Sequence, residues 1–340
     1  MKQIRYWDFI DISKGIGILL VVLGHSFPDA TSKSGISVPF FRMIESLIYT
    51  FHMPLFFFIS GFLAYNVVYE KETFNSVKKL KKLVIPYLFM SIVYIPLRLF
   101  ASGLAVSKYD TGSFWKILIG VSPNGGLWFL YVLALSIIIS YYFLTKKNIY
   151  IFLIIFTTLS FLTRGLILNP SYSVLKYLCY NYVFFIIGII FKRYSKTFFS
   201  YLKKINWLFI PIVFLIIFYP YYYYDLSYFA FLLAIIGILM VLKISFLFEK
   251  RETHAKKFLS YLGKTSMYIY LLHGPLLVVL RFILWRYLKL DYTICVCLMF
   301  SLSLIFSILI FEYIIRYSSL LNWLLTGVRR KSKYLVRPNN

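Results

Sequence analysis

The chain has 340 residues, of which 61% are apolar, 21% aromatic and only 14% charged. Soluble domains carry about 25% charged residues, so this composition excludes an ordinary soluble globule. The net charge of +25 does not indicate nucleic-acid binding, because Lys and Arg form short clusters between long apolar runs rather than one basic face. Cys179, Cys295 and Cys297 lie in apolar runs without a CxxC pattern, which argues against a disulfide framework or a structural zinc site.

The apolar runs divide the chain into ten segments. A bilayer core needs about 20 predominantly apolar residues per helix, so each segment is a candidate transmembrane helix. The segments are 9–27, 47–68, 83–105, 127–144, 149–168, 174–191, 205–224, 226–247, 262–285 and 292–316. We therefore predict an all-α, polytopic integral membrane protein with about ten transmembrane helices.

The connections between these segments alternate in charge. Lysine-rich and arginine-rich connections such as EKETFNSVKKLKK and FKRYSKTFFSYLKK alternate with weakly charged ones such as YPYYYYD. The positive-inside rule then places both termini in the cytoplasm. We expect a single transmembrane domain over 1–340, of which 317–340 forms a basic cytoplasmic tail.

The first segment, FIDISKGIGILLVVLGHSF, contains three polar side chains that lipid disfavours. A charge inside a transmembrane helix costs at least ~2.5 kcal/mol, which makes Asp11, Lys14 and His25 functional candidates. Lys14 and His25 lie within about 20° of each other around the helix, and Asp11 is one turn from Lys14. This stripe must face protein or water. The alternative is that Asp11 and Lys14 mark the cytoplasmic interface and His25 binds a backbone carbonyl.

The second segment, YTFHMPLFFFISGFLAYN, runs in the opposite direction. His52 therefore enters the membrane at nearly the depth that His25 reaches, and we expect the two histidines to converge. A histidine pair can bind metal, but no carboxylate or third histidine lies close in the sequence. Proton transfer is the favoured interpretation, because imidazole titrates near neutrality.

Two later segments contain further polar groups. His273 lies about halfway along the ninth segment, and the following Gly274 and Pro275 are expected to kink or break that helix. A role in the site and a hydrogen bond to a carbonyl freed at the kink are equally good readings of His273. Arg98 in the third segment either binds an anionic acceptor or an oxyanion from an outer cavity, or extends outward to the membrane surface.

The sequence KKLKKLVIPY places Lys78, Lys79, Lys81 and Lys82 ahead of a helix that we expect to begin near Pro86. Two interpretations remain open. The lysines either anchor the chain on anionic lipid, at about 1 kcal/mol per charge, or form an inner vestibule for a phosphate-rich ligand. No GxxxxGK[ST] loop occurs, so nucleotide hydrolysis has no motif to support it.

Five motifs together resemble the membrane-bound acyltransferase family 3, in particular its sugar O-acetyltransferase branch with the fucose 4-O-acetylase-like proteins. The motifs are DFIDISKGIGILLVVLGHSF, FHMPLFFFISGFL, KKLKKLVIPY, GGLWFL and LGKTSMYIYLLHGPL, in the expected order along nearly the whole chain. The family pattern of a basic residue, ten residues and a histidine is met by Lys14 and His25. Lys stands where Arg is common, and Lys lacks the planar fork of a guanidinium.

The resemblance implies an activity and a location. Members transfer an acyl group, usually acetyl, from cytoplasmic acyl-CoA to a hydroxyl of a carbohydrate at or beyond the outer face of the bacterial cytoplasmic membrane. The expected partners are acetyl-CoA or another acyl-CoA as donor, a carbohydrate or lipid-linked glycan as acceptor, and the lipid bilayer. Neither a metal ion nor nucleic acid is expected.

The resemblance also implies roles for particular residues. His25 is expected to be the general base, with Asp11 and Lys14 as its polar support, and His52 either completes the base or stabilises the oxyanion. The donor is expected at Lys78, Lys81, Lys82 and Trp128, and the acceptor at Arg98 and His273.

Alternatives to this reaction remain. Direct transfer in a ternary complex is the first choice. An acyl-enzyme on Ser or Tyr is the second, because the sequence does not indicate an activated nucleophile. A transporter or flippase for a lipid-linked sugar would also use intramembrane charges, although no inverted repeat supports it. A catalytically inert receptor is the third possibility.

Overall fold

The structure is a computed structural model that describes residues 6–28, 37–69, 71, 73–101, 111–122, 125–163, 173–249 and 252–328. Within these ranges the chain forms helices and connecting turns and contains no strand, which confirms the predicted all-α class.

The α-helices are α1 (Tyr6–His25), α2 (Ser37–Leu63), α3 (Tyr65–Tyr69), α4 (Thr73–Ala101), α5 (Trp128–Tyr142), α6 (Ile149–Leu162), α7 (Ser173–Arg193), α8 (Ser195–Lys204), α9 (Phe209–Tyr223), α10 (Phe229–Glu249), α11 (His254–Leu280), α12 (Tyr292–Tyr313) and α13 (Ser319–Thr326). Short 3₁₀-helices are η2 (Thr111–Ile119), η3 (Gly125–Leu127) and η6 (Ile315–Tyr317), and the segment η5 (Arg281–Tyr287) is a π-helix.

Several helices are suited to cross a membrane. Each of the ten predicted segments overlaps one helix, namely α1, α2, α4, α5, α6, α7, α9, α10, α11 or α12. Among the described residues, seven helices are long and apolar enough to span a bilayer: α2, α4, α5, α7, α10, α11 and α12. Helices α6 and α9 are apolar but shorter, and α1 carries Asp8, Asp11 and Lys14. The chain is thus a multi-pass membrane protein, and the count of ten spans and the side of each terminus stay predictions.

The prediction that a helix begins near Pro86 is wrong, because α4 begins at Thr73 and continues through both Pro86 and Pro96. A proline inside a helix removes one backbone hydrogen bond, and packing against neighbouring helices makes this tolerable. In the same way, α11 continues through Pro275, so of the two expected outcomes after His273 the break is absent and the kink stays a prediction. The four lysines therefore project from the first turns of α4 instead of preceding it.

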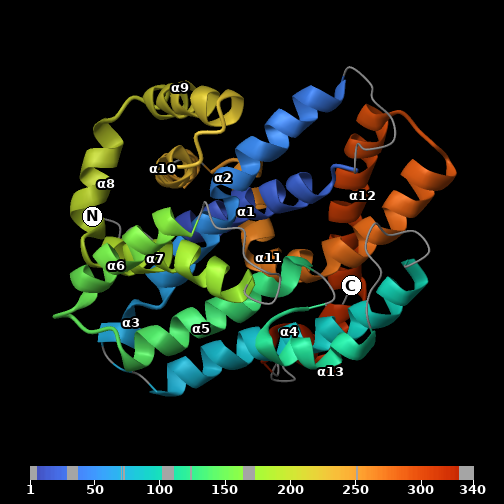
Figure 1. Cartoon of the computed structure of the whole chain (residues 1–340), viewed down its shortest axis with the longest axis horizontal. Helices are drawn as coiled ribbons and strands as arrows, with labels where there is room; N and C mark the ends of the chain where they lie inside the picture. The colour runs from blue at the N-terminus through green and yellow to red at the C-terminus, as the bar shows by residue number, and fades with distance from the viewer. Residues whose placement is uncertain are drawn as a thin grey trace.

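The arrangement of the helices places α1, α2 and α11 in the middle of the molecule (Figure 1). In this view α9 and α10 lie above them, α4, α5 and α13 lie below, and α12 lies to the right. Helix α1 packs against α2, α10, α11 and α12, so most of its circumference contacts protein. This placement gives the polar stripe of α1 a protein environment.

Helices α1 and α11 approach each other closely at two glycines. A Cβ added to Gly15 would lie 2.0 Å from the carbonyl oxygen of Leu259, and one added to Gly263 would lie 1.8 Å from that of Asp11. Only glycine leaves room for such backbone contact. Small residues at helix interfaces are the usual means of close packing in membranes, where the hydrophobic effect between helices is lost.

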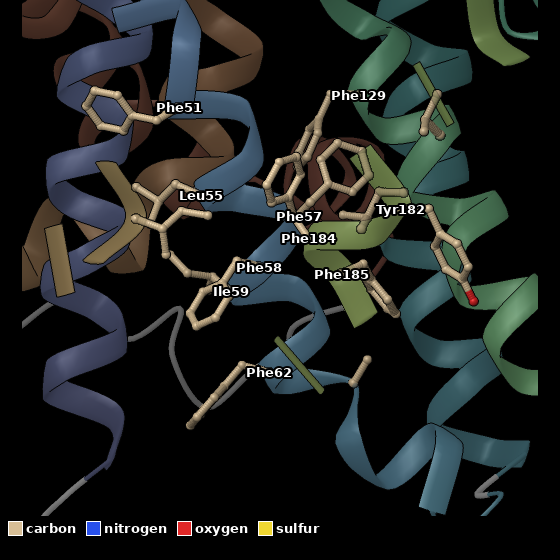
Figure 2. Close-up of a cluster of buried hydrophobic side chains, with 14 of the residues drawn as sticks. Phe51, Leu55, Phe57, Phe58, Ile59, Phe62, Phe129, Tyr182, Phe184 and Phe185 are labelled. Carbon is tan, nitrogen blue, oxygen red and sulfur yellow. The ribbon is translucent and has the colours of Figure 1, made fainter. Parts of the chain in front are cut away.

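Helices α2 and α7 pack through a second reciprocal pair of glycines. A Cβ at Gly61 would lie 1.9 Å from Phe185 O, and a Cβ at Gly188 would lie 2.0 Å from Phe58 O. Around this contact the side chains of α2, α5 and α7 form an aromatic core (Figure 2). The core includes Phe57, which packs edge to face on Phe129 with ring centroids 5.2 Å apart.

We predict that Gly263→Ala destabilises the protein by about 1–3 kcal/mol, because the new methyl group forces α1 and α11 apart. The measurement is the thermal unfolding midpoint of the detergent-solubilised protein. Gly125→Ala is the matched control, since a Cβ there meets nothing within 4 Å. Equal midpoints for the two variants would contradict the packing argument.

Candidate active site

Three histidines from three helices are joined by ring contacts, two of them with Tyr49 and one with another histidine. His25 is the last residue of α1, His52 lies in α2 and His273 in α11. The rings of His25 and His273 stack, with centroids 5.3 Å apart and an interplanar angle of 18°. The Tyr49 hydroxyl is 2.7 Å from His25 Nδ1, and the Tyr49 ring packs edge to face on His52 at 4.9 Å. The histidine cluster, defined as His25, His52 and His273, is therefore continuous through one tyrosine.

Two of the three rings are held by their own helices. His52 Nδ1 donates to Ile48 O at 2.8 Å, and His273 Nδ1 donates to Ile269 O at 3.1 Å. Because a carbonyl oxygen only accepts, Nδ1 carries the hydrogen in both rings and Nε2 has the lone pair when the imidazole is neutral. Both side chains are buried, and Nε2 of His273 has no hydrogen-bond partner among the described residues.

Asp11 and Lys14 form an ion pair in the first half of α1, with Lys14 Nζ 2.6 Å from Asp11 Oδ1. Lys14 is 11 residues before His25, which is roughly 16 Å along a helix, so the pair does not touch the histidine cluster. Lys14 instead lines an internal cavity. The polar residues of α1 therefore lie at two separate places: Lys14 at the cavity and His25 in the histidine cluster.

The cavity has a volume of about 170 Å³ and lies between α1, α2, α4, α5 and α11. It is lined by Lys14, Val21, Met53, Phe56, Ile59, Ser60, Leu63, Leu83, Phe129, Leu130, Leu133, Ser266, Met267 and Tyr270. Most of this wall is apolar or aromatic. One charged residue, two serine hydroxyls and one phenol supply the polar groups.

The cavity lies between the histidine cluster and the first turns of α4, and neither the histidines nor the α4 lysines are among its lining residues. Its wall on α2 runs from Met53, the neighbour of His52, to Leu63, a distance of about 15 Å at 1.5 Å per residue. At the far end, Lys79 Nζ donates to Leu63 O at 2.6 Å. At the near end, the Tyr270 ring lies 6.1 Å from that of His273 and its hydroxyl donates to Gly126 O. The apolar wall and the few polar groups suit a small, largely uncharged group.

The remaining candidate residues are less closely grouped. Lys78, Lys81 and Lys82 are exposed on the first turns of α4. Trp128 begins α5 and stacks on Tyr177 with ring centroids 4.1 Å apart. The side chain of Arg98 lies outside the described residues. Within the described part of the chain, no three His, Cys, Asp or Glu side chains are grouped to hold a metal ion.

The first residues of the predicted basic tail, 317–328, also reach this region. Helix α13 packs against α4, and Gly327, with a φ of 65°, sits so close to α4 that an added Cβ would lie 2.1 Å from Lys81 O. Residues 329–340 of the predicted tail lie outside the described residues.

The structure adds Tyr49, Tyr270 and Arg281 to the site. Each tyrosine precedes a histidine by three residues, so the helical spacing before His52 and His273 is a signal that could have indicated them. Arg281 has no such local signal. Its Nη2 donates to the carbonyl oxygens of His25 and Phe27, at 3.1 and 3.3 Å, across more than 250 residues of sequence.

Comparison with known proteins identifies the family. The family model described as an acyltransferase domain, Acyl_transf_3, matches residues 7–312, nearly the whole chain and all residues of the histidine cluster. The chain belongs to this acyltransferase family, and the resemblance seen in the sequence is confirmed.

Two curated relatives carry the name nodulation protein NolL. The protein from Sinorhizobium fredii (strain NBRC 101917 / NGR234) is 30% identical over 200 residues, which cover 54% of this chain and 48% of the relative. The protein from Mesorhizobium japonicum (strain LMG 29417 / CECT 9101 / MAFF 303099) is 26% identical over 210 residues, covering 60% and 52%. The chain spans about half the length of the curated relatives it matches. No solved structure matches it.

We predict that Ser60→Phe lowers kcat/KM for the acyl donor at least tenfold, because a phenyl ring fills most of a cavity of this size; an engineered cavity of about 150 Å³ binds one benzene molecule. Ser60→Ala, which removes only the hydroxyl, is expected to retain nearly full activity. The measurement is steady-state kinetics on purified protein with the donor concentration varied. Full activity of Ser60→Phe would show that the donor does not use this cavity.

Proposed function

We propose that this protein is an integral membrane O-acyltransferase that moves an acetyl group from cytoplasmic acetyl-CoA to a hydroxyl of a cell-envelope or exported carbohydrate. The observation that carries the proposal is the histidine cluster of α1, α2 and α11, beside which lies a mostly apolar cavity lined by Met53 and Tyr270. The acetyl thioester end of acetyl-CoA is small and weakly polar, as such a cavity requires. The proposed setting is a bacterial cytoplasmic membrane, with both termini in the cytoplasm.

The proposed reaction is direct transfer in a ternary complex. His25 removes the proton from the acceptor hydroxyl as its oxygen attacks the thioester carbonyl, which forms a C–O bond and a tetrahedral oxyanion. Collapse of this intermediate breaks the C–S bond, and the proton held by His25 passes to the departing CoA thiolate. The products are the acetylated sugar and CoA with a free thiol, so the enzyme returns to its starting state.

The hydrogen bonds of the other two histidines favour particular roles for them. His52 donates its Nδ1 hydrogen to Ile48 O, so the neutral ring has only a lone pair at Nε2 and cannot donate to an oxyanion. Of its two expected roles, assistance to the base is the better supported. His273 has the same arrangement, and its buried Nε2 is suited to accept a hydrogen bond from a sugar hydroxyl.

The two basic groups are proposed to hold different parts of the donor. Lys78, Lys81 and Lys82 are exposed at the inner mouth and suit the 3′-phosphate and diphosphate of CoA. Lys14 lines the cavity, but Asp11 balances its charge, so this wall presents a polar surface of low net charge to the amide groups of the arm. Trp128 in the donor site and Arg98 in the acceptor site remain part of the proposal on the resemblance alone.

The direct test of the function uses purified protein in liposomes with labelled acetyl-CoA and candidate glycans. Release of CoA that depends on the glycan supports the acyltransferase, and movement of the glycan without consumption of acetyl-CoA supports a flippase. Comparison of envelope polysaccharides and exported glycosides with and without the gene identifies the acceptor by the missing O-acetyl group. If no glycan loses an acyl group, the proposed acceptor class is wrong.

We predict that His25→Ala lowers the transfer rate ~100- to 10,000-fold, the usual cost of removing a general base. The protein should still fold, because this side chain lies at the end of α1 and is only half-buried. The measurement is single-turnover transfer of labelled acetyl. His254→Ala, at an exposed position at the start of α11, is the control. More than a tenth of wild-type activity in His25→Ala would exclude His25 as the base.

We also predict that changing Lys78, Lys81 and Lys82 together to Gln raises the KM for acetyl-CoA and leaves the KM for the acceptor unchanged. High salt should raise the donor KM of the wild type in the same direction, because it screens exposed charges. The control changes three other exposed lysines, Lys146, Lys147 and Lys257, to Gln. If both triple variants lower membrane insertion but keep the wild-type KM, the lysines of α4 serve only as membrane anchors.

A further inference from the structure

Helix α1 ends at His25, so its last four carbonyl groups have no partner within the helix. The structure supplies a donor for each of them. Ser26 Oγ donates to Val22 O at 2.7 Å, Ser26 N to Leu23 O at 3.0 Å, Tyr49 Oη to Gly24 O at 3.5 Å, and Arg281 Nη2 to His25 O at 3.1 Å. Among the described residues, Tyr49 is the donor that serves Gly24 O.

This assignment favours one direction for the hydrogen bond between Tyr49 and His25. A phenol has one hydrogen and can donate it once. If Tyr49 gives its hydrogen to Gly24 O, its oxygen can only accept from His25 Nδ1, which lies 2.7 Å away. His25 then carries its hydrogen on Nδ1 and has its lone pair on Nε2. The reverse direction would leave Gly24 O unpaired and put the hydrogen on Nε2.

The other two histidines show the same pattern. His52 and His273 each donate Nδ1–H to the carbonyl four residues earlier in their own helix. His25 instead has its Nδ1 beside a hydroxyl from a different helix. Tyr49 thus takes the place that a backbone carbonyl has for the other two rings.

We propose that Tyr49 is a positioning residue that holds His25 in the tautomer with hydrogen on Nδ1, so that Nε2 is the atom that removes the proton from the acceptor hydroxyl. This inference rests on the proposed role of His25 as the base. A base oriented by a third group is the general logic of catalytic triads, and Tyr49 supplies that third group here. The two bonds of Arg281 to His25 O and Phe27 O hold the backbone, while Tyr49 holds the ring.

The first experiment observes the tautomer directly. The chain has four histidines, so ¹⁵N-histidine labelling of the wild-type protein gives few signals, and the spectrum of His25→Ala assigns that of His25. We expect a protonated Nδ1 and an unprotonated Nε2 for His25 in the ligand-free protein at a pH where the ring is neutral. A hydrogen on Nε2 in that spectrum would overturn the proposal, whatever the activity of any variant.

The second experiment measures Tyr49→Phe, which removes one hydroxyl and keeps the ring that packs on His52. We expect kcat to fall at least tenfold and the KM for acetyl-CoA to stay within about twofold, because the base is misoriented while the donor site is intact. The acceptor is the glycan identified by the envelope comparison. Tyr292→Phe is the matched control, since it also removes one tyrosine hydroxyl, which donates to Pro28 O just beyond α1.

The outcomes separate this inference from the proposed function. An unchanged kcat in Tyr49→Phe together with an inactive His25→Ala would reject Tyr49 and keep His25 as the base. An active His25→Ala would reject the proposed mechanism itself. A fall in kcat in both Tyr49→Phe and Tyr292→Phe would indicate a general loosening of the end of α1 and would also overturn the specific role of Tyr49.

Discussion

The contact between α1 and α11 at Gly15 and Gly263 sets the position of the whole site. Each glycine lies ten residues before a histidine, His25 on α1 and His273 on α11, so both rings sit about 15 Å beyond the contact. Because the two helices rise equally from a point of backbone contact, the imidazoles arrive at the same level and stack. The reciprocal glycines of α2 and α7 hold α2 in place in a similar way. Helix α2 carries Tyr49, His52 and one long side of the cavity, so this contact positions all three. Bulkier residues at these positions would widen the bundle.

Hydrogen bonding to the backbone determines which atoms remain available for chemistry. The Nδ1 atoms of His52 and His273 are bonded to carbonyl groups, and the last carbonyls of α1 are served by donors from two helical segments, α2 and η5, and from the following residue, Ser26. Backbone groups in a membrane interior need partners from the protein, because lipid offers none. As a result Nε2 of His273 is left without a hydrogen-bond partner among the described residues and is available as an acceptor.

The sequence predicted much of the fold and part of the site. Every predicted segment overlaps a helix, because long apolar runs can only be helices in a bilayer. The predicted start of α4 near Pro86 is wrong, because a proline is typical of a helix boundary but packing tolerates this one inside the helix. That His273 rather than His52 stacks on His25 depends on which helices touch, and Arg281 reaches α1 from a distant π-helix, so no spacing rule indicates either contact. Tyr49 lies three residues before His52, so helical spacing could have indicated it.

The pairing of α1 with α11 also has a consequence for biogenesis. Helix α1 emerges from the ribosome well before α11, which begins at His254, so the glycine contact must wait for roughly 230 more residues. At about 5–20 residues per second this delay lasts on the order of 10–50 s. During that time Asp11 and Lys14 lack the neighbour that shields them, and an isolated charged helix is costly in lipid. The insertion machinery must therefore retain α1 at a hydrated or protein-lined position until the ninth predicted segment arrives.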